Sequence, residues 1–86
     1  MALNVNVVSA DREVWTGSAS QVVARTVEGE IGILSGHQPM LALLAQGEVR
    51  VTLNNGDKVT VDAEGGFLSV DNDMVNIVAS KASLVA

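Results

Sequence analysis

Apolar residues recur at every second position over much of the chain, and this spacing restricts the fold more than any other feature. Between Leu3 and Val7 they alternate with asparagine, and between Glu48 and Asn54 they alternate with charged and polar residues. Successive side chains of a β-strand point to opposite faces, so a period of two indicates strands with one buried face. Helical periodicity is weak throughout. The chain is therefore predicted to be all-β.

Short turn-forming clusters separate these segments. Asn55-Gly56 stands between two alternating segments and predicts a tight hairpin, because Asn and Gly tolerate the positive φ angles of such turns. The segment 40–46 suits either a buried strand or a helical turn after Pro39, and we favour the strand. Similar clusters divide the chain into about eight to ten segments of strand length, at residues 10–12, 28–30, 35–37, 64–66 and 71–73.

The amount of apolar material sets the size and the kind of core. A chain of 86 residues forms one domain, placed at residues 1–86, and buries only about 60 to 65% of the surface that its unfolded form exposes. Apolar residues make up 48% of the sequence, but only Trp15 and Phe67 are aromatic, so Val, Leu, Ile and Ala must fill the interior. Many short strands with regular turns predict a sandwich or a flattened barrel.

Charge and composition argue against several classes of partner. The net charge is −5 and the five basic residues are scattered, so no basic stripe is available for nucleic acid. The chain has no cysteine, which removes disulfides and thiolate sites. The longest apolar run, Met40–Ala45, is far shorter than the roughly 20 residues that cross a bilayer. No transmembrane segment or export signal is expected.

Residues of catalytic or metal-binding type occur singly. His37 is the only histidine and lacks further ligands at a suitable spacing, and Ser35 lies in no Gly-x-Ser-x-Gly elbow. Asp71–Asp73 resembles the start of a calcium loop, but Asn76 stands where that loop requires glycine, so a turn is favoured. No catalytic, nucleotide-binding or metal site and no cofactor is predicted. No phosphate-binding Gly-Lys-Ser/Thr follows the glycines at positions 29, 32 and 36.

Lys58 supports an alternative function. Asp57-Lys58-Val59 resembles the modified lysine of a lipoyl- or biotinyl-type carrier hairpin, and such carriers are also small β-sandwiches. Here the lysine follows the Asn55-Gly56 turn instead of occupying its tip, and alternation places it on the solvated face, which favours a plain surface charge. A carrier domain and a free-standing protein-interaction module remain the alternatives to the function considered next.

Several segments together resemble a known family. Three segments are similar, in order and spacing, to the N-terminal β-sandwich domain of the epsilon subunit of F-type ATP synthase. They are Val7-Val8-Ser9-Ala10, Val14-Trp15-Thr16-Gly17 and Glu28-Gly29-Glu30-Ile31-Gly32-Ile33-Leu34-Ser35-Gly36-His37-Gln38-Pro39-Met40-Leu41. Gly47–Val51 and Gly65–Val70 continue the pattern. The match covers nearly the whole chain, and its central Gly-Glu-x-Gly-x-x-x-Gly-His-x-Pro is its most specific part.

The resemblance implies a ten-stranded sandwich and a non-catalytic role. A subunit of this family belongs to the central stalk, or rotor, of a proton- or sodium-translocating ATP synthase, where it links the gamma subunit to the c-ring and couples ion-driven rotation to ATP synthesis. It would lie peripherally on the cytoplasmic face of the bacterial plasma membrane, held there by the complex.

The resemblance also implies which residues meet the partners. Glu30 and His37 fall at c-ring-facing positions, on loops at one end of the sandwich. The gamma-facing candidates are Ser9, Met40, Ala42 and Leu44. The apolar residues of Met40–Leu44 are equally consistent with a place in the core. If they form an exposed patch, such a patch favours a homodimer when the chain is isolated.

The chain departs from the family pattern at two places. Ser35 stands where the family often has proline before the Gly-His pair, which predicts a less rigid loop because proline would have fixed its φ angle. The sequence ends at Ala86, before the inhibitory C-terminal helical hairpin that most epsilon subunits carry. We therefore expect assembly and coupling without the helical brake.

Overall fold

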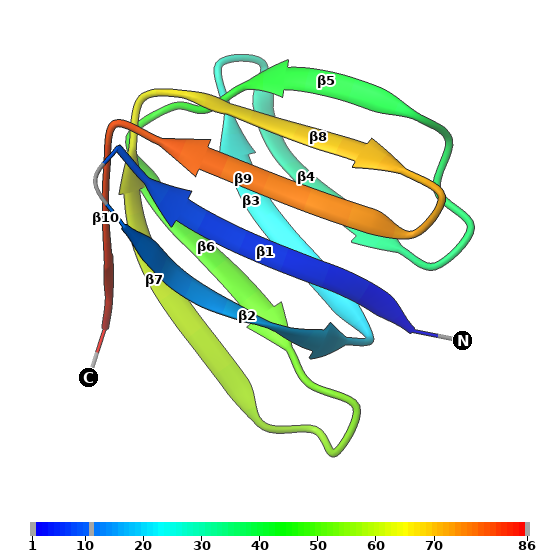
Figure 1. The fold of residues 1–86 in the computed structure, drawn as a ribbon. Coiled ribbons are helices and arrows are strands. Elements are labelled where there is room, and N and C mark those ends of the chain that lie inside the picture. Colours follow the sequence, from blue (N-terminus) through cyan, green and yellow to red (C-terminus); the bar gives the residue numbers. More distant parts are fainter. Residues whose placement is uncertain (1, 11, 86) are drawn as a thin grey trace.

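Ten β-strands follow one another along the part of the chain that the computed structural model describes, residues 2–10 and 12–85 (Figure 1). This confirms the predicted all-β fold with ten strands. No helix long and apolar enough to cross a membrane occurs among these residues. The strands are β1 Leu3–Ser9, β2 Glu13–Ala19, β3 Gln21–Thr26, β4 Gly29–Leu34, β5 Met40–Leu43, β6 Gly47–Thr52, β7 Lys58–Glu64, β8 Phe67–Asp71, β9 Met74–Ala79 and β10 Lys81–Leu84.

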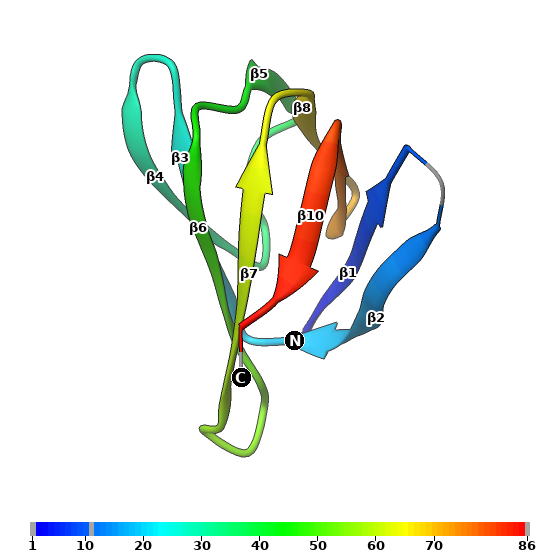
Figure 2. The same ribbon diagram turned by 90° about the vertical axis from the view of Figure 1, so that its left-hand side faces the viewer.

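The strands form two five-stranded sheets that share no strand. The first sheet has the order β2-β1-β9-β8-β5, and the second has the order β10-β7-β6-β3-β4. Only β1 and β9 pair in parallel, and every other pairing is antiparallel. In Figure 2, β4, β3, β6 and β7 lie on the left and β1 and β2 on the right. The molecule is thus a sandwich and not a closed barrel.

Aliphatic side chains from both sheets fill the space between them. Every buried residue of the core is Val, Leu, Ile or Ala, as the scarcity of aromatic residues predicted. Within β1, Leu3, Val5 and Val7 are at most 1% exposed, and the asparagines between them are more exposed. The core consists of residues 3, 5, 7, 19, 22, 24, 33, 44, 49, 51, 61, 63, 68, 70, 75, 77 and 79.

The turns predicted at residues 55–56 and 71–73 are present, whereas the predicted 10–12 turn includes Asp11, which lies outside the described residues. Asn55 and Gly56 lie in the loop between β6 and β7, where Gly56 has a φ of 94° and the Leu53 amide donates to the Asp57 carbonyl over 2.7 Å. Asn72 and Asp73 connect β8 to β9 with φ angles of 49° and 61°. Two successive positive φ angles are typical of a type I′ hairpin turn, which confirms the turn interpretation of residues 71–73.

Two glycines have the same φ angle, but we expect their substitution by alanine to reduce stability by different amounts. Gly66 and Gly56 both have a φ of 94°, but a Cβ on Gly66 would overlap the Val78 carbonyl, whereas a Cβ on Gly56 would meet nothing within 4 Å. Gly56→Ala should cost about 1 to 2 kcal/mol, the strain of a left-handed alanine. Gly66→Ala should cost more than about 3 kcal/mol, because β8 and β9 must also move apart. Urea unfolding of the two variants compares these costs, and equal losses would contradict the close approach at Gly66.

Candidate partner interface

Four apolar side chains form a continuous row across the outer face of the first sheet. The register pairs Leu43 of β5 with Phe67 of β8, Phe67 with Val78 of β9, and Val78 with Val8 of β1. Residues paired directly across neighbouring strands point to the same face of a sheet. Leu43 is 62% exposed and Phe67 39%, so this face is the outer one. We call Val8, Leu43, Phe67 and Val78 the outer apolar row.

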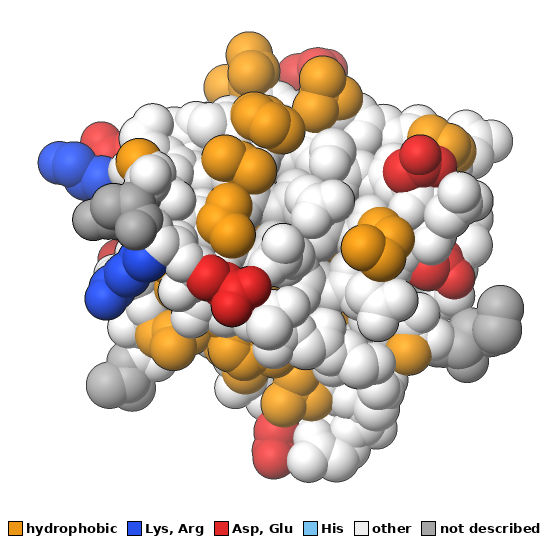
Figure 3. All heavy atoms as spheres, viewed as in Figure 1, with side chains coloured by type: hydrophobic (Ala, Val, Ile, Leu, Met, Phe, Trp, Pro, Cys, Tyr) orange, Lys and Arg blue, Asp and Glu red, His pale blue; other side chains and the backbone are white. Residues whose placement is uncertain are grey.

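The outer apolar row has a defined border. Val8 pairs with Glu13 of β2, so a carboxylate follows the row at that edge of the sheet. The neighbouring row begins with Leu41, which is 71% exposed, and continues through Ser69 and polar residues of β9 and β1. Figure 3 shows hydrophobic side chains running across this face with few charges among them. Such a contiguous apolar surface is typical of a binding face for another protein.

Three of the four gamma-facing candidates lie in the opposite phase of the same strands. Met40 pairs with buried Val70 and Ala42 with buried Leu68, so both side chains belong to the inward phase of β5, where they are half-buried. Ser9 likewise pairs with Ala79, which is 2% exposed.

Leu44 is only 5% exposed and packs in the core. The core alternative therefore holds for Leu44, whose side chain is not available to a partner. Sequence reasoning included Leu43 only within the Met40–Leu44 segment, where every residue is apolar and alternation gives no face. It missed Phe67, Val8 and Val78, although each is an apolar residue at an outward position of its strand.

Glu30 lies in β4 and not in a loop. It is exposed and stands directly opposite Arg25 of β3, next to the hairpin that joins the two strands. Thr26 fixes this hairpin: its hydroxyl donates to the Gly29 carbonyl over 2.8 Å and accepts from the Glu28 amide over 3.2 Å. The hairpin therefore holds the Glu30 carboxylate at a defined end of the sandwich.

His37 lies at the other end of β4. It follows Leu34, the last residue of the strand, and its amide donates to the Leu34 carbonyl over 3.1 Å. Its Nδ1 lies 2.8 Å from the Gln38 carbonyl. At about 3.3 Å per residue, Glu30 and Leu34 are already separated by roughly 13 Å. The expectation that Glu30 and His37 share one end of the sandwich is therefore wrong.

Asp73 fastens the loop that carries His37. Its Oδ1 accepts a hydrogen bond of 2.7 Å from the Gly36 amide, and its Oδ2 accepts one of 2.9 Å from the Ser35 hydroxyl. These bonds, that from Gly36 first, lower the pKa of the Asp73 carboxyl below its ordinary value. Ser35, which was expected to leave the loop less rigid than proline would, thus supplies a restraint of its own. Sequence reasoning missed Asp73.

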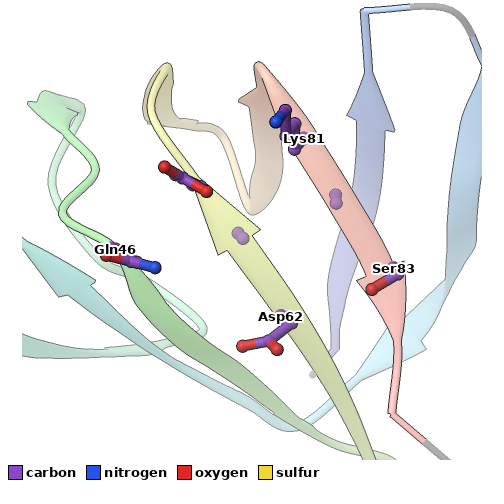
Figure 4. A pocket seen from close by; sticks show the side chains of 7 residues that line it. Gln46, Asp62, Lys81 and Ser83 are labelled. Carbon is purple, nitrogen blue, oxygen red and sulfur yellow. The ribbon is translucent and has the colours of Figure 1, made fainter.

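The outer face of the second sheet is different in character. Glu48 and Arg50 form an exposed ion pair there, with 3.5 Å between Oε1 and Nε. A shallow hollow on the same sheet is lined in part by Gln46, Asp62, Lys81 and Ser83 (Figure 4). Among the described residues no group of three His, Cys, Asp or Glu side chains could hold a metal ion.

Lys58 opens β7, is exposed, and pairs with Thr52 of β6. It therefore stands in the strand after the hairpin and not at the tip, where a carrier lysine was sought. Its position matches that of an ordinary surface charge.

Comparison with known proteins identifies the family. Residues 2–85 match the family model described as "ATP synthase, Delta/Epsilon chain, beta-sandwich domain". The chain belongs to this family. The ATP synthase epsilon chain of Micrococcus luteus is 58% identical over 95% of this chain and 90% of its own length. The epsilon chain of Streptomyces avermitilis is 43% identical over 95% of this chain, but only 66% of its own length is covered. The resemblance to the epsilon subunit that the sequence indicated is thereby confirmed.

Chains in two solved ATP synthase structures share the fold. A chain in the mitochondrial ATP synthase of Euglena gracilis, from a structure of its OSCP, F1 and c-ring, superposes with a TM-score of 0.91 at 27% identity. That match covers 96% of this chain and 53% of the other. A chain in the central stalk and c-ring structure of the Tetrahymena thermophila enzyme has a TM-score of 0.74 at 17% identity, covers 95% and 66% of the two chains, and supports the fold alone.

The hydrogen bonds of Asp73 predict how this epsilon-family chain responds to acid. Because the folded-state pKa is lowered, the carboxylate contributes stability above its unfolded pKa, and this contribution is lost as the pH falls through the folded value. Ser35→Ala should raise the Asp73 pKa only part of the way back to its ordinary value, because the Gly36 bond remains. The carboxyl carbon shift of Asp73, followed by NMR, measures the midpoint. Ser83→Ala on β10 is the control, and an unchanged midpoint in Ser35→Ala would contradict the assignment of the bond.

Proposed function

We propose that this chain is a non-catalytic rotor subunit, which links the gamma subunit to the c-ring of a proton- or sodium-translocating ATP synthase and couples ion-driven rotation to ATP synthesis. Its family and the fold it shares with chains in stalk and c-ring assemblies support this role. The bacterial relatives support a peripheral place on the cytoplasmic face of the plasma membrane. The sequence as given contains no helical hairpin, so we expect no inhibitory brake from these residues.

The outer apolar row is the observation that carries the proposal. Burying a leucine or phenylalanine side chain stabilises a contact by about 1.5 to 3 kcal/mol, whereas one exposed ion pair contributes about 0.2 to 1 kcal/mol. A subunit that transmits torque therefore requires an apolar contact as its main attachment. The outer apolar row offers one on a stiff sheet, and we assign it to the gamma subunit. That the half-buried residues Ser9, Met40 and Ala42 also contact the gamma subunit stays a prediction.

The gamma contact can be tested by paired substitutions on the two faces. Leu43→Ser with Phe67→Ser removes the two more exposed members of the outer apolar row, and we expect binding to gamma to weaken about 10- to 100-fold. The matched control is Glu48→Ser with Arg50→Ser on the opposite face, which should leave affinity unchanged. Titration calorimetry with purified gamma subunit gives the dissociation constants, and circular dichroism checks the fold. Equal affinity of the two double variants for gamma would contradict the assignment.

The ring contact is proposed for Glu30 and His37 together. Since they lie at opposite ends of β4, a ring surface that meets both must extend along the edge that β4 forms. Glu30→Ala and His37→Ala should each weaken attachment to the ring by less than about 5-fold, as expected of an exposed polar contact, and should leave the fold intact. Their neighbours supply the controls Glu28→Ala and Gln38→Ala. Co-sedimentation of the gamma–epsilon pair with purified c-ring measures attachment, and a double variant that attaches like the wild type would refute this contact.

The carrier alternative predicts a covalent change that can be measured directly. A carrier domain expressed with lipoate or biotin gains the mass of the cofactor on its lysine. The position of Lys58 within β7 argues against this. An intact-mass spectrum with an added cofactor would favour the carrier over the rotor subunit.

A further inference from the structure

Asp73 occupies a backbone position that suits glycine better. It is the second of two left-handed residues in the β8–β9 turn, with a φ of 61° after 49° at Asn72. Glycine takes this conformation without steric cost, and Asn-Gly is a preferred pair for such turns. Among L-residues, aspartate and asparagine tolerate it best. An aspartate at this position therefore indicates that its side chain has a role beyond forming the turn.

The side chain of Asp73 supplies that reason. Its two oxygens bind two consecutive residues of the β4–β5 loop, the Gly36 amide over 2.7 Å and the Ser35 hydroxyl over 2.9 Å. The residues joined are 37 and 38 positions apart in the sequence. Hydrogen bonds to a carboxylate are stronger than those between neutral groups. One side chain thereby ties a turn of the first sheet to a loop that leaves the second.

The loop and the turn form one surface. Gly36, His37 and Pro39 of the loop line an open hollow together with Asn72 and Asp73 of the turn. Gly36 itself has a φ of 86°, and a Cβ there would meet nothing within 4 Å, so neighbouring side chains do not hold the backbone in place. The carboxylate of Asp73 and the bond from the His37 amide to Leu34 both restrain this part of the loop.

We propose that Asp73 is a positioning residue that holds the Ser35–Pro39 loop in the conformation in which it meets the c-ring. The inference rests on the proposed function, which assigns His37 to that contact. A loop that populates its binding conformation only part of the time binds with an affinity reduced by that fraction. Asp73 thus acts through the loop and supports affinity without having to touch the partner.

Three variants of the β8–β9 turn separate this role from a structural one. Asp73→Gly suits the left-handed position but removes both bonds to the loop. Asn72→Gly makes the same change at the neighbouring left-handed position, whose side chain makes no hydrogen bond within the described part of the chain. Asp73→Asn keeps an oxygen to accept from Gly36 and an amide to donate to Ser35, without the negative charge. Each is measured in the 86-residue chain and in its complex with gamma and c-ring.

The expected results differ between the variants. In Asp73→Gly the backbone order parameter of Gly36 should fall from about 0.85 to below about 0.6, and ring attachment should weaken about 3- to 5-fold, at most as much as in His37→Ala. Asn72→Gly should change neither, and Asp73→Asn should stay within about 2-fold of the wild type in attachment. Circular dichroism should show the fold retained in all three.

Several outcomes would overturn the inference. The bonds to the loop do not position it for the ring if the Asp73→Gly variant attaches to the ring as well as the wild type does. The same conclusion follows if Asn72→Gly weakens attachment as much as Asp73→Gly. In both cases the gamma contact and the proposed function would stand. A wild-type chain that attaches to neither gamma nor the ring would instead contradict the proposed function, and the inference with it.

Discussion

The packing of two aliphatic sheet faces against each other is the constraint on which the rest of this structure depends. An 86-residue chain has little interior, and its inward positions are filled by Val, Leu, Ile and Ala. The core leaves no room for the outward apolar residues of the first sheet. The outer apolar row therefore takes no part in the core and is available to a partner. Because a β-sandwich is closely packed, a load applied to that row passes through a stiff body.

The sequence was enough to predict where the strands lie, but not which face of every strand is buried. Alternation in Leu3–Val7 showed which residues are buried, since only one phase is apolar, and the structure agrees. Along Met40–Leu44 every residue is apolar, so alternation could not choose between the phases. Pairing with β8 makes the choice, turning Leu41 and Leu43 outward and leaving Met40 and Ala42 facing the core. That decision depends on a strand more than twenty residues away in the sequence.

Contacts between distant residues were beyond sequence reasoning for the same reason. Asp71–Asp73 was identified as a turn from its composition, but nothing local indicates that Asp73 binds Ser35 and Gly36. Likewise, the family pattern placed Glu30 and His37 close together in the sequence, and an extended β4 then separated them. Local pattern thus predicts elements, while long-range pairing determines which side chains a partner meets.

Protection of the outer face of the first sheet by the gamma subunit is the most direct test of this account. The chain has no cysteine, so a single thiol introduced by Ser69→Cys, beside the outer apolar row, can be labelled with maleimide. Glu48→Cys on the opposite face gives the reference rate. The account predicts that bound gamma subunit slows labelling at position 69 about 10-fold or more and leaves position 48 unchanged. Equal labelling at position 69 with and without gamma would contradict it.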